Sequence, residues 1–442
     1  MQDHSEPNKL FIGLAGLGTV GSGLVTLLKD NADIIRKRTG RSIILKKVLV
    51  HNLNKPRKVE LPPDVVLTDN LHDLTDDPTL DAIVEVIGGQ DTASQIISKA
   101  LDAGKDVVTA NKALLAENGL PLFAKANEKG CLLRYEASVA GAIPIVQTLK
   151  ESLAGNRIFS LIGILNGTSN YILSRMTTEK LDFASALKEA QELGFAEADP
   201  SLDIDGFDTA HKLCLLIRLA FGVHYNFPDI PVQGIRNLQA IDIQLANELG
   251  YHIKLIGQVR EVSDTTKTSK LEAGVFPALV PLHFLLARVD GSFNALHITA
   301  NAAGSLFFHG RGAGDLPTAS AVLADLLAVA RHESPNNTGY FEPNLPMALT
   351  LSPGQAASCY YMRIMVEDYP GVLRDIAGCM ACEQINMSHV VQRADANTSN
   401  SSYVPLVILT HETTAQAMSA AIERINELKL PKEPIVIFKV LA

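Results

Sequence analysis

The first 145 residues alternate short apolar runs with longer amphipathic runs, and this alternation constrains the fold more than any other feature of the chain. Five runs have the length and composition of buried strands: 9–16, 42–50, 82–89, 106–110 and 131–137. Helical patterns lie between them, at 19–38, 92–104 and 120–130. Because strands that alternate with helices form parallel sheets covered on both faces, we expect a doubly wound α/β domain over residues 1–145.

A G-x-G-x-x-G turn separates the first expected strand from the first expected helix. Its residues are Gly16, Leu17, Gly18, Thr19, Val20 and Gly21. In such a turn the first glycine allows the tight bend, the second lets the backbone approach a pyrophosphate, and the third permits close packing of helix on strand. A diphosphate then rests at the helix N-terminus. The sequence therefore predicts a dinucleotide site in a Rossmann-type domain.

The residues after the second expected strand bear on the choice of nucleotide. NAD-binding domains place a carboxylate there to hold the ribose diol. This chain has His51 and Asn52 instead, followed by the cations of Lys55 and Arg57. With no carboxylate to repel a 2′-phosphate, the pattern favours NADP(H), with NAD(H) as the alternative.

The remaining chain divides by composition into further parts. Residues 146–313 mix strand and helix patterns and suggest an α+β catalytic and dimerisation domain on an open sheet. A helix at about 314–332 is expected to return and complete the first domain. Residues 333–356 are rich in Pro, Asn, Ser and Gly, as linkers are. Residues 357–442 show a strand–helix–strand–strand–helix–strand pattern, which is ferredoxin-like.

An acidic loop runs straight into an apolar helix within residues 190–212. The loop and the start of the helix carry Glu197, Asp199, Asp203, Asp205, Asp208 and Lys212. Asp208 and Lys212 are four residues apart and share one helix face. Acids that converge on a lysine suggest a site that binds an ammonium group and moves a proton. The alternative is a solvated loop with Asp208 in the first helical turn, where the helix dipole favours it.

Composition excludes several classes of partner. A net charge of −9 and a pI near 5.8 argue against nucleic acid and anionic membranes. The N-terminus is polar, unlike a signal or transit peptide, and no apolar run reaches the ~20 residues of a membrane helix. Five cysteines without framework spacing suit a reducing cytoplasm, and Cys379 and Cys382 are expected to be packing residues.

The acidic segment closely resembles the signature of the homoserine dehydrogenase family. The matching residues are Ala190, Gly194, Phe195, Ala196, Asp199, Pro200, Asp203, Ile204, Gly206, Asp208 and Lys212. Further family-like motifs surround Lys112, Glu136, Asn166 and Gly314 in the same order. The chain departs from the family at His51, where arginine is usual, and at Ala142, where glycine is common.

The resemblance implies reversible reduction of L-aspartate 4-semialdehyde to L-homoserine by NAD(P)H, on the route to threonine, methionine and isoleucine. Glu197 and Asp208 match the acids that hold the substrate, with Asp203 in support. Lys212 matches the proton donor, and Lys112 matches a second essential lysine beside the cofactor.

The resemblance also implies a monovalent cation, sodium. It would be held by the Glu136 carboxylate and by the backbone carbonyls of Val139, Gly141 and Ile143. A glycine-rich turn exposes carbonyls, and hard cations take oxygen ligands. The alternative is a plain strand-to-helix turn.

Three more glycines are expected near the cofactor. Gly194 would lie close to both cation and cofactor, while Gly312 and Gly314 would approach the nicotinamide, since glycine permits close backbone contact.

The C-terminal part resembles an ACT domain, with the turn 368–371 at the usual ligand position. This implies threonine as an effector, against the alternative of a purely structural module. A homodimer or homotetramer is expected, because the open middle sheet needs covering. Two rival functions are an aldehyde dehydrogenase using the thiolate of Cys131 or Cys214, and a catalytically inactive amino-acid sensor.

Overall fold

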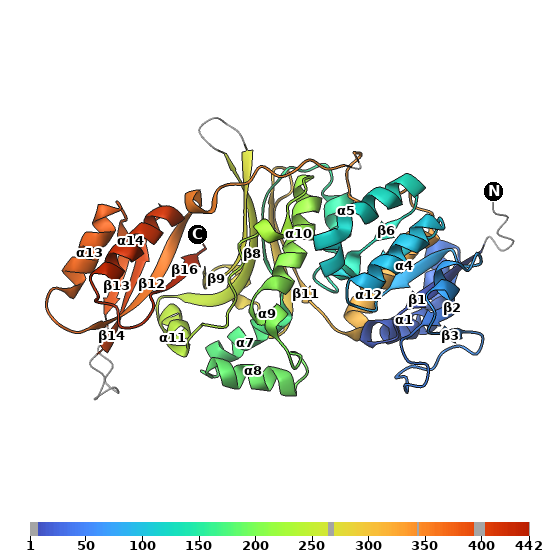
Figure 1. Ribbon diagram of the computed structural model, residues 1–442, viewed down its shortest axis with the longest axis horizontal. Helices are drawn as coiled ribbons and strands as arrows, with labels where there is room; N and C mark the ends of the chain where they lie inside the picture. The colour runs from blue at the N-terminus through green and yellow to red at the C-terminus, as the bar shows by residue number, and fades with distance from the viewer. Residues whose placement is uncertain (1–7, 264–268, 343, 393–402, 442) are drawn as a thin grey trace.

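The computed structural model describes residues 8–263, 269–342, 344–392 and 403–441. Three parts follow one another along its long axis: a parallel sheet with its helices, an antiparallel sheet with its helices, and a C-terminal unit (Figure 1). The predicted α/β class is confirmed.

The N-terminal sheet has six parallel strands in the order β3-β2-β1-β4-β5-β6. Their bounds are β1 Lys9–Ala15, β2 Ser42–Leu49, β3 Val66–Thr68, β4 Ala82–Glu85, β5 Asp106–Thr109 and β6 Leu133–Arg134. The five predicted strands are present, and β3 is an addition. The order reverses at β1, where doubly wound sheets bind ligands at the carboxyl ends of their strands.

The helices of this part differ from the prediction at two boundaries. They are α1 Thr19–Asp30, α2 Ala32–Thr39, α3 His72–Thr75, α4 Asp91–Asp102 and α5 Lys112–Lys129. The single helix predicted at 19–38 is interrupted at Asn31, which has non-helical φ and ψ of −106° and 14°. Helix α5 begins at Lys112 rather than Leu120 because the Asn111 side chain accepts the Leu114 amide at 3.1 Å and caps the helix.

The middle part is an antiparallel sheet in the order β11-β10-β7-β8-β9. Its strands are β7 Ile158–Ile164, β8 Tyr251–Ser263, β9 Ser269–Pro281, β10 Phe293–Ala300 and β11 Gly304–Arg311. Its principal helices are α6 Ile145–Gln147, α7 Gly167–Thr178, α8 Phe183–Glu192, α9 Ser201–Ile204, α10 Phe207–Phe221 and α11 Ala240–Glu248. Helix α10 is buried from Asp208 to Ala220 and lies between the sheet and α5 (Figure 1).

Helix α12, Asp315–Ala330, follows β11 and packs against α1 of the N-terminal part. The approach is close: a Cβ on Gly23 would lie 2.8 Å from the Asp315 carbonyl oxygen. Apolar side chains of α12, including Val322 and Leu326, join the core formed by β1 and β2. The N-terminal sheet is thus covered by a helix that follows the middle part in sequence.

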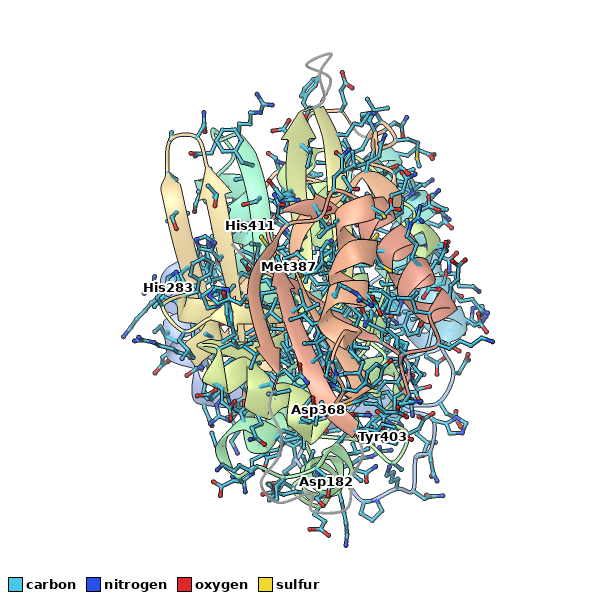
Figure 2. All side chains as sticks on the ribbon, turned by 90° about the vertical axis from the view of Figure 1, so that its left-hand side faces the viewer. Asp182, His283, Asp368, Met387, Tyr403 and His411 are labelled. Atoms are coloured by element: carbon cyan, nitrogen blue, oxygen red, sulfur yellow. The ribbon has the colours of Figure 1, made fainter. Side chains whose placement is uncertain are left out.

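Apart from the two-residue strand β15, the C-terminal unit has the element order βαββαβ and the antiparallel strand order β16-β12-β14-β13. Its elements are β12 Ala357–Glu367, α13 Val372–Cys382, β13 Met387–Gln392, β14 Tyr403–Thr410, β15 Thr413–Thr414, α14 Ala415–Glu427 and β16 Val436–Val440. Both helices cover one face of the sheet (Figure 2). The sequence pattern predicts a strand over residues 387–395, and residues 393–395 lie outside the described ranges.

The C-terminal unit is joined to the middle part in two ways that the sequence did not indicate. Strand β16 pairs in parallel with β9, so the two sheets are continuous. Arg363 of β12 forms a buried ion pair with Asp242 of α11, with Nε 2.6 Å from Oδ1. Among the described residues, no helix is long and apolar enough to cross a membrane.

Candidate active site

Asp208 stands at the centre of a buried charged cluster between α10 and α5. It occupies the first turn of α10, which begins after Gly206 in the left-handed conformation (φ +89°). The Lys212 Nζ donates to Asp208 Oδ2 at 2.7 Å, and the Lys112 Nζ lies 3.2 Å from Oδ1. The structure therefore brings together the two predicted lysines and the predicted acid.

The cluster is ionised because its charges compensate one another. Burial raises the pKa of Asp208, but Lys212 and Lys112 together lower it further, and the result is well below its usual range. The Asp208 charge outweighs burial at Lys112 and raises the pKa of that ammonium. The Asp208 carboxylate thus faces two ammonium groups, and Asp203 and Glu197 add further negative charge nearby.

Asn166 links the second predicted acid to the first. Its Nδ2 donates to Asp203 Oδ1 at 2.6 Å and to Asp208 Oδ2 at 2.8 Å. Its Oδ1 accepts the Ser169 amide at 2.7 Å and caps α7. Burial and the charge of Asp208 raise the pKa of Asp203. Sequence analysis placed Asn166 in a motif but not in the site, although N-G-T-S before a helix is a capping signal.

Lys212 has a second anchor in the main chain. Its Nζ donates to the Leu165 carbonyl at 2.6 Å, and the same oxygen accepts Nδ2 of Asn294 at 3.0 Å. These contacts hold the ammonium of a side chain that is only 10% exposed. The main-chain contact therefore fixes the position of the Lys212 ammonium beside Asp208.

The remaining acids of the loop have two different roles: one acts on the charged cluster, and two stabilise the loop itself. Glu197 is exposed, and its charge contributes to the raised pKa of Lys112. Asp199 accepts the Ser201 amide at 3.1 Å at the start of α9, and Asp205 pairs with Arg236 at 2.8 Å. Asp199 and Asp205 therefore stabilise the loop.

The glycine-rich turn opens into a cavity of about 770 Å³ at the carboxyl ends of β1 and β2. A Cβ on Gly18 would meet nothing within 4 Å, so this backbone borders open space. A Cβ on Gly21 would lie 2.1 Å from the Gly16 carbonyl oxygen, and Gly16 has φ +103°. The described lining residues of the turn are Gly16, Leu17, Gly18 and Thr19; Val20 and Gly21 are not among them.

The far side of the same cavity is basic. His51, Lys55, Arg57 and Lys58 all line it, and the Arg57 guanidinium donates to the Asn52 carbonyl. Asp69 is the one acid that lines the cavity among the described residues. Basic side chains thus outnumber acids in the lining of this part of the cavity.

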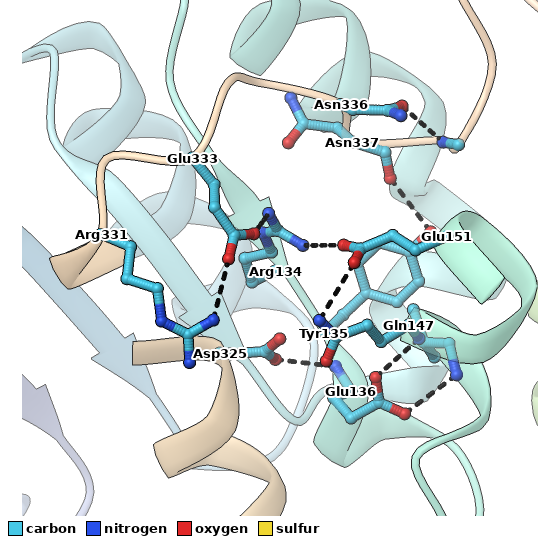
Figure 3. Close-up of polar contacts among 12 residues, drawn as sticks. Arg134, Tyr135, Glu136, Gln147, Glu151, Asp325, Arg331, Glu333, Asn336 and Asn337 are labelled. Carbon is cyan, nitrogen blue, oxygen red and sulfur yellow. Dashed lines mark hydrogen bonds and ion pairs between the residues drawn. The ribbon is translucent and has the colours of Figure 1, made fainter. Parts of the chain in front are cut away.

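In the predicted cation loop, the backbone already engages the Glu136 carboxylate (Figure 3). Both Glu136 carboxylate oxygens accept hydrogen bonds from backbone amides, one from Val146 at 2.9 Å and one from Gln147 at 2.8 Å. Burial raises the pKa of Glu136 to about 7. Within the described ranges, no hydrogen bond reaches the Val139 or Gly141 carbonyls, and no group of three or more His, Cys, Asp and Glu side chains could hold a metal.

The loop packs directly on the turn before α12. A Cβ on Gly141, which has φ +57°, would lie 2.5 Å from the Gly312 carbonyl oxygen, and a Cβ on Gly312 would lie 2.2 Å from the Asn294 side chain. Gly314 (φ +129°) precedes α12, and Gly194 (φ +76°) follows α8 in an exposed turn. Close packing thus explains Gly141 and Gly312, while Gly194 borders open space.

The cysteines are placed unfavourably for thiolate chemistry. Burial raises the pKa of Cys131 and of Cys214 to about 11 in each case. The Cys214 Sγ donates to the Tyr225 carbonyl at 3.3 Å. Thiols of this kind are inert, which argues against an aldehyde dehydrogenase that uses a cysteine.

Comparison with known proteins gives consistent matches. Residues 16–136 match the model of the homoserine dehydrogenase NAD-binding domain, and residues 144–327 match that of homoserine dehydrogenase. The chain is 40% identical over 437 residues to a Neisseria gonorrhoeae homoserine dehydrogenase, covering 97% of this chain and 98% of that protein. It is 39% identical over 428 residues to the Bacillus subtilis enzyme, covering 96% of each.

Solved structures similar to this chain are also homoserine dehydrogenases. A homoserine dehydrogenase from Thiobacillus denitrificans is 40% identical and aligns over 98% of both chains with a TM-score of 0.91. A hyperthermophilic archaeal homoserine dehydrogenase in complex with NADPH is 25% identical and aligns over 74% of this chain and 99% of that one, with a TM-score of 0.61.

A parallel dinucleotide-binding sheet beside a buried lysine–aspartate cluster defines an NAD(P)-dependent oxidoreductase. More narrowly, the chain belongs to the homoserine dehydrogenase family. Its reaction is the reversible, NAD(P)H-dependent reduction of L-aspartate 4-semialdehyde to L-homoserine. The rival of an inactive sensor is not favoured.

Proposed function

We propose that the cluster around Asp208 both holds the substrate and supplies its proton. Glu197 and Asp208 bind the ammonium group of L-aspartate 4-semialdehyde, and Asp203 supports Asp208 through Asn166. Lys212 protonates the carbonyl oxygen as it becomes an alkoxide, and Lys112 stabilises the same charge. The nicotinamide supplies the hydride when bound. In the reverse direction Lys212 accepts the hydroxyl proton of homoserine.

The observation that carries this proposal is the buried contact of Lys212 with Asp208 at 2.7 Å, with Lys112 on the other carboxylate oxygen at 3.2 Å. The test compares the semialdehyde with 4-oxobutanoate, which has the same aldehyde and carboxylate but no amino group. We expect kcat/KM to fall at least tenfold for 4-oxobutanoate, since a hydrogen bond to a charged group contributes about 1.5–3 kcal/mol. Equal kcat/KM values would remove the acids from substrate binding.

We propose NADP(H) as the preferred nucleotide, with NAD(H) as the alternative. Support comes from the basic side chains of His51, Lys55, Arg57 and Lys58 in the lining of the nucleotide cavity. A 2′-phosphate pairs favourably with such cations. Gly194, Gly312 and Gly314 are proposed to border the cofactor, and Lys112 to contact it.

We propose a sodium ion in the loop that follows β6, held by the carbonyls of Val139, Gly141 and Ile143. The unengaged carbonyls of Val139 and Gly141 support this placement. The carboxylate of Glu136 accepts hydrogen bonds from two backbone amides and so holds the loop in its conformation. Replacing sodium by tetramethylammonium at constant ionic strength should lower activity, and equal rates in both salts would exclude the site.

We propose that residues 357–442 form an ACT regulatory domain responding to threonine, reached through the linker 333–356. The βαββαβ order supports this assignment. Asp368, after β12, and Tyr403, at the start of β14, lie at the same end of the unit (Figure 2). Threonine should change the initial rate or the Tm. No change in either would leave the unit a structural module.

We propose domains at 1–145, completed by residues 314–332, and at 146–313, with assembly into a homodimer or homotetramer through the middle sheet. We further propose a cytoplasmic enzyme of threonine, methionine and isoleucine biosynthesis, without nucleic-acid or membrane partners. Sedimentation equilibrium tests the assembly.

A further inference from the structure

A second cavity lies away from the active site, between the C-terminal end of α10 and the middle of α5. Its volume is about 310 Å³, and it is bordered by α5, α10 and the segment after α12. The walls are largely apolar and include Leu120, Pro121, Phe123 and Leu345. One charged side chain lines it, that of Arg218 in the last turn of α10.

Arg218 differs from the other buried arginines of the described chain. Three arginines are less than 9% exposed: Arg134, Arg218 and Arg363. Arg134 pairs with Glu333 at 2.6 Å and Arg363 with Asp242 at 2.6 Å. Arg218, 2% exposed, has no carboxylate partner in the described ranges, and its Nε and Nη1 make no hydrogen bond there.

The surroundings of Arg218 compensate its charge only in part. Its guanidinium lies 4.7 Å from the centre of the Phe123 ring, and it stands where the helix dipole favours a cation. Each contributes about 0.5–2 kcal/mol, whereas burying an unpaired charge costs several kcal/mol. Because arginine does not deprotonate in proteins, the Arg218 charge is left for an anion to balance.

We propose that this cavity is a binding site for a small monocarboxylate with an apolar body. The planar guanidinium matches a carboxylate in a two-bond arrangement, and one positive charge is balanced by one negative charge. The apolar body rests on Leu120, Pro121 and Leu345. A cavity of about 310 Å³ holds a molecule of this size.

The site connects the two helices that carry the catalytic lysines. Helix α5 has Lys112 at its first residue, and α10 has Lys212 in its second turn. Glu117 of α5 and His211 of α10 also join the two helices, with His211 Nε2 2.7 Å from Glu117 Oε1. A ligand that fills the cavity therefore stabilises the packing of α5 on α10 and acts on the enzyme from a distance.

Thermal unfolding of the full chain tests the proposal with matched probes: sodium butanoate, butylammonium chloride and sodium chloride, at constant sodium concentration and ionic strength. Butanoate should raise the Tm in a saturable manner, as a ligand of the folded state does, and the other two should not. Arg218→Met should weaken butanoate binding at least about tenfold, and Arg218→Lys should weaken it less because lysine keeps the charge. The exposed Arg38→Met is the control and should respond like the parent chain.

Three results would overturn the proposal. In the first, Arg218→Met has a higher Tm than the parent chain without any anion, and butanoate raises the Tm of both chains equally. Arg218 would then carry a buried charge that nothing compensates. Another is an Arg218-dependent rise with chloride alone, which marks a halide site. The third is no effect of butanoate on the Tm of the parent chain.

Discussion

Lys112 and Asp208 come from different parts of the fold and meet in the active site, with Nζ 3.2 Å from Oδ1. Lys112 is the first residue of α5 in the nucleotide-binding part, whereas Asp208 belongs to α10 in the middle part. The contact places a group from the cofactor side against the acid proposed to hold the substrate. Binding of the nucleotide and of the substrate is therefore expected to be coupled through this pair.

Replacing Lys212 should separate chemistry from nucleotide binding. Lys212→Met removes the proposed proton donor, so kcat should fall by about 10²–10⁴, the usual contribution of a general acid. The Kd for NADPH, measured by fluorescence titration, should stay within about twofold because Lys212 does not line the nucleotide cavity.

Two further variants sharpen this test. Lys212→Arg keeps the positive charge but is a poor acid near neutral pH, so kcat should remain low. Lys188→Met, on an exposed lysine of α8, should leave kcat unchanged. A kcat for Lys212→Arg close to that of the parent would assign Lys212 an electrostatic role only.

Features set by neighbouring residues were predictable from the sequence. The turn at 16–21 and the shared face of Asp208 and Lys212 both depend on short spacings, and the structure shows both. The capping of α5 by Asn111 is equally local, and it was overlooked although N-K-A-L contains the signal.

Contacts between distant segments could not be predicted in this way. Asn166 bonds to Asp203 across 37 residues, and Arg363 to Asp242 across 121 residues. Neither pairing follows from periodicity, because each depends on how two complete elements pack. The continuity of β9 with β16 was missed for the same reason.

The basic side of the nucleotide cavity gives a second prediction. Arg57→Gln should raise the KM for NADPH by about tenfold and the KM for NADH by much less, because only NADPH offers a 2′-phosphate to the lost cation. Initial rates with both nucleotides measure this ratio. Lys37→Gln, on the exposed face of α2, is the matched control, and parallel changes in both KM values would show that Arg57 does not read the phosphate.

The acid limb of the pH profile should report Asp203. Burial and the neighbouring Asp208 raise the pKa of Asp203 above 3.8, whereas the lysines keep the pKa of Asp208 well below its usual range. As the pH falls, Asp203 therefore takes a proton first and the pull on the substrate ammonium weakens. The value of kcat/KM for homoserine should decline with an apparent pKa above 3.8, and Asp203→Asn should abolish this limb. A limb that survives in Asp203→Asn belongs to another group.

The ion pair of Arg363 with Asp242 gives a prediction about stability. The two side chains are 1% and 0% exposed, and Tyr361 Oη also donates to Asp242 at 3.2 Å. Arg363→Met leaves the Asp242 carboxylate buried without its cation, so unfolding free energy should fall by about 3–5 kcal/mol. Urea denaturation measures the loss.

The double variant decides whether the loss arises from the orphaned charge. Arg363→Met with Asp242→Leu removes both charges, so it should be more stable than Arg363→Met alone, because replacing both partners of a buried pair is often neutral. Arg374→Met, which breaks the exposed pair with Asp375, should cost less than about 1 kcal/mol. If the double variant lost as much as the two single variants combined, packing of the Arg363 stem, and not charge, would join the C-terminal unit to α11.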